Sequence, residues 1–192
     1  SSDRPSSDAA SNLLCGARVA TADFGEVVGV MHAETSDSYD WIHRGTKVRK
    51  MHASRRDAFR SMNATPLGKV RPEGPVEITE PVQPRAKGPT QVDDKLDLDV
   101  ALVHFYPGMK PAVLENCLHE AHGVVLAGTG LGHTAHDLIP AIHRATRDGV
   151  PIVMTTQTLQ GRVSMRVYDT GRDLIRAGVI SGEDMLPEVA YV

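Results

Sequence analysis

The sequence predicts an α/β protein in which the tail of one α/β domain is joined by a linker to a second, smaller α/β domain with a parallel sheet. After residue 96, strand-like and helix-like runs alternate with short glycine-marked turns, which is typical of a parallel sheet covered on both faces. Prolines concentrate just before this region, as they do in linkers. We therefore divide the chain into residues 1–70, 71–95 and 96–192.

The first segment carries one expected helix and one expected strand. Ser7 and Asp8 are residues that cap helices, and they predict a helix through about Ala17. Residues 27–31 form an apolar, β-like run. The segment therefore reads as the end of an α/β domain.

The linker is marked by five prolines, Pro72, Pro75, Pro81, Pro84 and Pro89. It contains one short strand-like run at residues 76–79. Proline fixes the backbone and removes a hydrogen-bond donor, so we expect little regular structure here.

The third segment repeats a strand and helix unit. The expected elements, in order, are a strand over the run VALVHFY from Val100, a helix over 110–121, a strand over 123–127, a helix over 138–147 and a strand over 151–155. Ser181, with Asp184 three residues later, resembles a capping box that opens a last helix, cut off at Val192. Asp169, Arg172 and Asp173 beside Tyr168 are interpreted as a polar turn leading into a helix.

Composition favours a globular protein of the cytoplasm. The chain has 192 residues, of which 41% are hydrophobic, and a net charge of −3. Cys15 and Cys117 are far apart in sequence, so free thiols in a reducing compartment are the simpler interpretation. No apolar run reaches the length needed to span a membrane. The slight acidity disfavours bulk nucleic-acid binding but leaves room for a local basic patch.

Such a patch surrounds Lys50, in the run GTKVRKMHASRRDAF at residues 45–59. Neighbouring cations disfavour a further ammonium, so a partly buried Lys50 would have a lowered pKa and could act as a base. A solvated basic face is the plainer alternative. A third is a strip that contacts RNA phosphates, with Arg55 and Arg56 as the candidate residues for RNA or a partner.

Three sequence blocks carry a resemblance to a known family. They are SSDRPSSDAASNL at residues 1–13, Lys50 with the following run FRSMNATPLG at 59–68, and GRVSMRVYDTGRDLIRAGVISGEDMLPEVAYV at 161–192. Together they resemble the L-asparaginase and glutaminase family, and within it most closely the D subunits of archaeal glutamyl-tRNA(Gln) amidotransferases. The resemblance implies that residues 1–70 end an N-terminal asparaginase domain and that residues 96–192 form the C-terminal one.

The same resemblance implies that the chain is an internal fragment. The family's two catalytic threonines lie upstream of its SSDRPS block, and Ser1 already lies inside that block. Of the family's catalytic residues, only the lysine can be carried over, to Lys50. It would assist a threonine nucleophile, with the threonines and an aspartate supplied from elsewhere. By itself, the fragment is expected to be inactive.

The implied reaction releases ammonia from glutamine or asparagine for a partner, the amidotransferase E subunit, which uses ATP and Mg²⁺ to amidate Glu-tRNA(Gln). No ATP-binding loop is present in the sequence, and we expect no cofactor in this chain. A homodimer in complex with the E subunit and tRNA(Gln) is expected by analogy. Two alternatives stay open: a stand-alone L-asparaginase, and a non-catalytic module that contacts tRNA.

The glycine-rich run GTGLGH at 128–133 follows a strand, at the sheet edge where α/β proteins bind ligands. Its spacing does not match a dinucleotide fingerprint, and a plain turn without a ligand is the simpler interpretation. In the resembled family this loop approaches a neighbouring subunit's active site, which makes His133 a candidate for substrate or interface contact. Paired histidines also occur at helical spacing, but no cysteine pair accompanies them and we expect no metal; they are His119 with His122, and His133 with His136, near Glu120 and Asp137.

Overall fold

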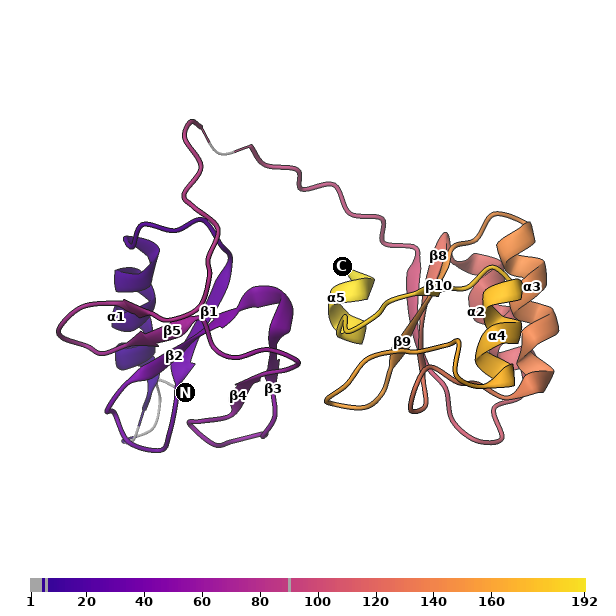
Figure 1. Ribbon diagram of the computed structural model, residues 1–192, viewed down its shortest axis with the longest axis horizontal. Helices are drawn as coiled ribbons and strands as arrows, with labels where there is room; N and C mark the ends of the chain where they lie inside the picture. The colour runs from indigo at the N-terminus through magenta and orange to yellow at the C-terminus, as the bar shows by residue number, and fades with distance from the viewer. Residues whose placement is uncertain (1–4, 6, 90) are drawn as a thin grey trace. The chain divides into compact units, whose positions relative to one another are not determined.

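The computed structural model of the protein describes residue 5, residues 7–89 and residues 91–192, and Figure 1 shows its ribbon. These residues separate into two units, Ser1–Val92 and Asp93–Val192. The first residues of the SSDRPS block lie outside the described part. The division falls inside the segment predicted as a linker.

The first unit is a small antiparallel sheet with one helix against it. Its sheet has the order β1-β2-β5-β6, and β3 and β4 form a separate hairpin. The elements are α1 (Ala9–Ala20), β1 (Val28–His32), β2 (Asp40–Arg44), η1 (Gly45–Lys47), β3 (Val48–Lys50), β4 (Phe59–Ser61), β5 (Gly68–Val70) and β6 (Glu77–Ile78).

Helix α1 begins close to where the sequence predicts. The hydroxyl of Ser7 accepts a hydrogen bond from the Ala9 amide at 3.1 Å, which satisfies one of the free donors of the first turn. Cys15 and Val19, four residues apart on the same face, are buried with Ile42 and Leu67 of the sheet region. Packing of this apolar face against the sheet therefore stabilises the helix.

The proline-rich segment is not wholly a linker in the structure. Strand β6 pairs with β5, with Ile78 opposite Gly68. Further along, the Gly25 amide donates to the Gln83 carbonyl at 2.8 Å, and Arg85 donates to the carbonyls of Ala20 and Ala22. Up to Arg85, the segment therefore belongs to the first unit.

The second unit is a parallel sheet with the order β10-β9-β8-β7. Helices α2, α3 and α4 lie together on one face and α5 lies on the other (Figure 1), against β7, β8 and β9. The elements are β7 (Val100–His104), α2 (Pro111–Glu120), β8 (Gly123–Gly128), η2 (His136–Leu138), α3 (Ile139–Arg147), β9 (Ile152–Thr156), α4 (Asp169–Arg176), β10 (Ile180–Ser181) and α5 (Pro187–Tyr191).

The order of the strands explains this arrangement of helices. Each crossover adds its strand on the same side of the previous one, so right-handed connections must place α2, α3 and α4 on one face. Every residue of β8 is buried. This confirms the predicted α/β class with a parallel sheet.

The start of the last helix was predicted wrongly. Ser181 lies in β10, opposite Met154 of β9, and its hydroxyl accepts a hydrogen bond from the Glu183 amide rather than capping a helix. Helix α5 begins at Pro187, because proline suits the first helical turn. The polar turn predicted from Asp169, Arg172 and Asp173 is in fact the first part of helix α4 itself, which begins at Asp169 and in which Asp169 pairs with Arg172. Among the described residues, no helix is long and apolar enough to cross a membrane.

Candidate functional site

Lys50 lies at the loop end of the β3–β4 hairpin, opposite Phe59. Its side chain is exposed, and its ammonium nitrogen lies 5.9 Å from the centroid of the Phe59 ring, within the range of a cation–π contact. The partial burial that would make Lys50 a base is therefore not present in this chain. The ammonium group instead lies at an exposed surface of the first unit, where residues from outside this chain could contact it.

The loop after Lys50, residues 51–58, is held by its own backbone and by His52. The Met51 amide donates to the Ala58 carbonyl at 2.6 Å. The Nδ1 atom of His52 accepts hydrogen bonds from the amides of Ser54 and Arg55, both at 3.1 Å. Residues 51–58 contain bends and a turn and no helix, so these hydrogen bonds fix the backbone of the loop.

Asp57 is the anchor of this loop. Its carboxylate is buried and accepts a bidentate pair of hydrogen bonds from Arg55, at 2.8 and 2.7 Å, and another from Arg60 at 2.7 Å. The hydrogen bonds and positive charge of these guanidinium groups hold the pKa of Asp57 below its usual value. The carboxylate therefore stays ionised and ties both arginines to the loop.

Arg55 and Arg56, the candidate residues for RNA or a partner, both bind within the chain. Arg55 is engaged by Asp57. Arg56 donates to the Thr35 carbonyl at 3.0 Å and also pairs with Asp37. A phosphate would have to compete with these carboxylates for the same guanidinium donors.

Behind the hairpin, His43 of β2 is 1% exposed. Its Nδ1 atom lies 2.8 Å from the hydroxyl of Ser61, and its Nε2 atom is buried without a hydrogen-bond partner in the described part of the chain. Burial, with a contribution from the nearby Arg60, lowers the pKa of His43 to about 4. The ring is therefore neutral at neutral pH.

His133 closes the loop that follows β8. The amides of Thr129 and His133 exchange hydrogen bonds with each other's carbonyls at 3.0 Å, and a side chain at Gly128 would come within 2.7 Å of the His133 carbonyl. The His133 ring packs edge-on to Tyr168, with 5.2 Å between centroids. Its Nε2 atom is enclosed and has no partner among the described residues, so in this chain the ring is packed against its own unit.

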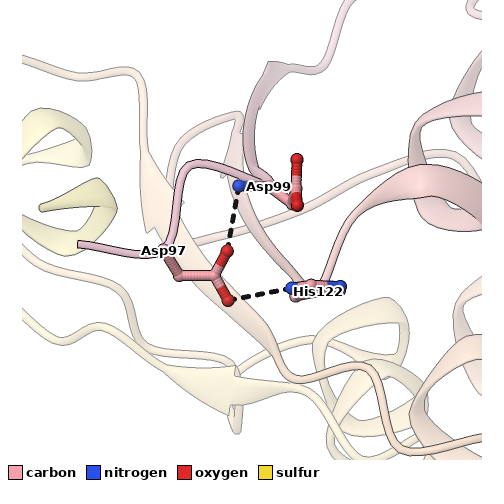
Figure 2. A group of neighbouring side chains, drawn as sticks. All are labelled: Asp97, Asp99 and His122. Atoms are coloured by element: carbon pink, nitrogen blue, oxygen red, sulfur yellow. Dashed lines mark hydrogen bonds and ion pairs between the residues drawn. The ribbon is translucent and has the colours of Figure 1, made fainter. Parts of the chain in front are cut away.

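One group of side chains has ligand spacing for a metal among the residues that the structure describes: Asp97, Asp99 and His122 (Figure 2). All three are exposed. The Asp97 carboxylate already accepts from His122 Nδ1 at 2.9 Å and from the Asp99 amide at 3.0 Å. These contacts explain the cluster as a satisfied surface turn. Of the paired histidines noted in the sequence, His122 belongs to this group and His119, His133 and His136 do not.

Sequence reasoning missed a polar network around the buried His32, which joins α1, β1 and β2. The available signal was the position of His32 at the end of an apolar strand, followed by Asp37 and Asp40. A lone histidine in such a place does not reveal that carboxylates fold back on both of its ring nitrogens.

Two family descriptions match the chain. Residues 1–83 match the N-terminal asparaginase domain, and residues 99–192 match the glutaminase and asparaginase C-terminal domain. Among curated proteins, the chain is 56% identical over 194 residues to the D subunit of the glutamyl-tRNA(Gln) amidotransferase of Pyrococcus furiosus, and 53% identical to the D subunit of the Archaeoglobus fulgidus amidotransferase. All of this chain is covered, but only 44% and 46% of those proteins.

Two solved structures of related proteins are L-asparaginases. The thermostable enzyme from Thermococcus kodakarensis is 30% identical, with a TM-score of 0.86 over 98% of this chain and 56% of that one. L-asparaginase I from Vibrio cholerae is also 30% identical, with a TM-score of 0.78 over 99% of this chain and 56% of that one. The chain thus spans roughly half the length of the proteins it matches.

Proposed function

The chain belongs to the asparaginase and glutaminase family, and we propose that it is part of a glutaminase subunit that supplies ammonia for converting Glu-tRNA(Gln) to Gln-tRNA(Gln). The observation that carries this proposal is the degree of similarity. Identity is 55% across the full chain to amidotransferase D subunits, against 30% to L-asparaginases. Within one family, the more similar relatives are the better guide to the substrate and partner.

The proposed chemistry is hydrolysis of the glutamine side-chain amide. A threonine hydroxyl attacks the amide carbonyl, ammonia leaves, and water releases glutamate from the ester that forms. A hydroxyl is a poor nucleophile at neutral pH and needs a base. Lys50 would belong to that base system, and the threonines and an aspartate would come from parts of the polypeptide that this chain does not contain.

The proposed partner is an E subunit that uses ATP and Mg²⁺ to activate the glutamate on tRNA(Gln), so that the complex as a whole acts as a ligase. This chain would bind no cofactor of its own. A homodimer that works in the cytoplasm completes the proposal. His133 and its loop, at the carboxyl end of β8, are candidates for contact with substrate or a neighbouring subunit.

The proposal is tested by ammonia release from glutamine and asparagine, using a polypeptide of the relatives' full length. We expect release from glutamine to rise several-fold when Glu-tRNA(Gln), ATP and the E subunit are all present. Omitting the tRNA alone is the control. Brisk asparagine hydrolysis that ignores both tRNA and partner would instead favour a stand-alone L-asparaginase, the second candidate, which the solved structures of similar fold support.

A third candidate is a non-catalytic module that contacts tRNA through the basic loop. It predicts binding of tRNA with a steep salt dependence, largely lost in the double variant Arg55→Gln and Arg56→Gln. Because both guanidinium groups already contact carboxylates, we expect the double change to alter tRNA binding less than twofold. Filter binding at several salt concentrations decides between these outcomes.

A further inference from the structure

His32, the last residue of β1, is fully buried. Its Nδ1 atom lies 2.6 Å from Asn12 Oδ1 and 3.2 Å from Asp40 Oδ1. Its Nε2 atom lies 2.9 Å from Asp37 Oδ1. Both ring nitrogens therefore face side-chain oxygen atoms at hydrogen-bonding distance.

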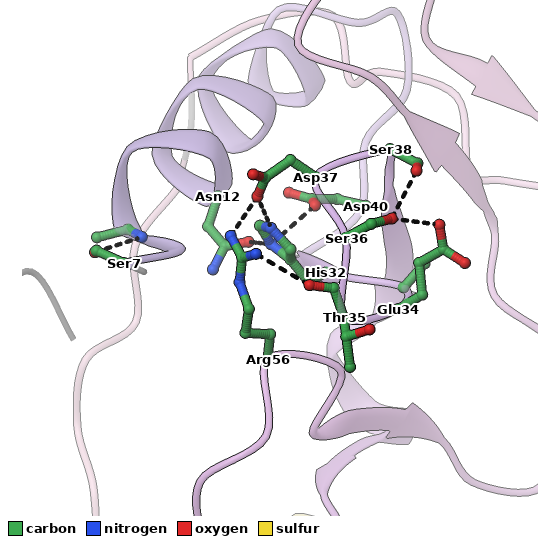
Figure 3. A network of polar contacts seen from close by, with 12 residues as sticks. Ser7, Asn12, His32, Glu34, Thr35, Ser36, Asp37, Ser38, Asp40 and Arg56 are labelled. Atoms are coloured by element: carbon green, nitrogen blue, oxygen red, sulfur yellow. Dashed lines mark hydrogen bonds and ion pairs between the residues drawn. The ribbon is translucent and has the colours of Figure 1, made fainter. Parts of the chain in front are cut away.

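These contacts join helix α1 to the hairpin formed by β1 and β2. Asn12 lies on α1, Asp40 begins β2, and Asp37 lies in the turn between β1 and β2. Figure 3 shows the three side chains converging on the ring of His32. Buried polar groups with several partners fix local geometry, because losing one partner leaves the others unsatisfied.

Asp37 extends this network to the loop that follows Lys50. The Oδ1 atom that faces His32 also accepts from the guanidinium of Arg56 (Figure 3). The second terminal nitrogen of Arg56, Nη1, donates to the Thr35 carbonyl at 3.0 Å. Arg56 is 19% exposed and Asp37 is 65% exposed, so the network runs from a buried imidazole to the surface through a single carboxylate.

A second connection runs beside the first. Arg60 of β4 donates to the Ala33 carbonyl at 3.0 Å and to Asp57 at 2.7 Å. The turn between β1 and β2 is thus joined to the loop of residues 51–58 at both Thr35 and Ala33. Lys50 ends β3, opposite Phe59, and immediately precedes this loop, whose first and last residues, Met51 and Ala58, are joined by a backbone hydrogen bond.

We propose that Asp37 is a positioning residue for Lys50: held by the buried His32, it holds Arg56, and so fixes the loop of residues 51–58 and with it the lysine. This inference rests on the proposed glutaminase function for its catalytic consequence. Its structural part, the fixing of the loop, stands separately. Misplacement of a catalytic group by about 1 Å can lower a rate on the order of 10²-fold, so such a support has measurable effects.

The experiment changes Asp37, because this carboxylate is the exposed member of the network and its replacement leaves the buried His32 in place. Asp37→Ala removes the carboxylate, and Asp37→Asn keeps one acceptor oxygen and serves as the conservative rescue. Glu34→Ala is the matched control: it removes a carboxylate from the same turn, whose Oε1 accepts from Ser36. All are made in the polypeptide of the relatives' full length.

Two readouts are measured on each variant. Amide hydrogen exchange follows residues 51–58, where the amides of Met51, Ser54 and Arg55 are hydrogen-bonded. Ammonia release from glutamine gives kcat and KM. For Asp37→Ala we expect exchange in this loop to quicken about tenfold and kcat to fall about tenfold, with KM within twofold of wild type. Asp37→Asn should recover part of both changes, and Glu34→Ala should alter neither.

The coupling is tested by combining Asp37→Ala with Arg56→Gln. If the two residues act in one connection, the double variant is no worse than the more damaged single variant. Additive losses, or an unchanged kcat despite faster exchange, would overturn the positioning role. Unchanged exchange would overturn the connection itself. A wild type that releases no ammonia would remove the proposed function, while exchange would still decide whether the connection exists.

Discussion

Replacing Lys50 by arginine should abolish most of the ammonia release of the full-length protein, although the positive charge is kept. A guanidinium stays protonated at any pH at which the protein is folded and cannot accept a proton. General base catalysis contributes roughly 10²- to 10⁴-fold. We therefore expect both Lys50→Arg and Lys50→Met to lower kcat/KM for glutamine by about that factor, measured by coupled detection of ammonia.

The Lys50→Arg variant distinguishes two roles for Lys50: proton transfer, and the supply of positive charge alone. Lys50 is exposed and lies against the Phe59 ring, a contact that arginine can also make. If Lys50 only supplied charge, Lys50→Arg would retain activity and Lys50→Met would lose it. Lys47→Met, which removes a charge from the last residue of η1, just before the same hairpin, is the control and should retain activity within about threefold. Full activity in both Lys50 variants would remove this residue from the mechanism.

The second unit was the more predictable part of the fold. Its strands and helices from Val100 to Thr156 follow apolar patterns that depend on local sequence, and the central strands β8 and β9 are almost wholly buried. The ends of this unit were less predictable. Ser181 has the sequence of a helix cap, yet it lies in β10, where pairing with β9 overrides the local preference.

The first unit was harder because its strands are short and pair over long distances. Strand β6 has only two residues, and it belongs to the sheet because Gly68 of β5 allows the Glu77 backbone to come close. Nothing in the proline-rich sequence around it predicts that pairing. The partners of Asp57 were equally hidden, since a carboxylate beside several arginines does not reveal which of them it holds.

His43 illustrates the same limit and gives a second prediction with a large effect. Its neighbours in sequence are Ile42 and Arg44, and this pattern does not indicate that the His43 ring is fully buried. In the structure the ring is enclosed, with a pKa lowered from 6.5 to about 4 by burial and by Arg60. His43 is therefore neutral in the folded protein at pH values above about 4.

The sign of the resulting pH dependence follows from linkage. Between pH 6.5 and about 4, the unfolded chain binds a proton at His43 and the folded protein does not. Stability therefore falls as pH falls through this window and is fully restored above pH 6.5. Each pKa unit corresponds to about 1.4 kcal/mol, so the contribution of His43 between pH 7 and pH 4.5 is about 2 to 3 kcal/mol.

Urea unfolding of wild type and His43→Gln at several pH values from 4.5 to 7.5 measures this contribution. Other groups also titrate at low pH, among them the buried Asp40, whose pKa is raised by burial and whose effect has the opposite sign. They are present in both proteins and cancel in the difference. Glutamine does not titrate, so the variant, whatever its stability at pH 7, should lose less stability on acidification than wild type. Parallel curves for the two proteins would show that water or a rearranged Ser61 already accommodates a charged ring behind the hairpin that carries Lys50.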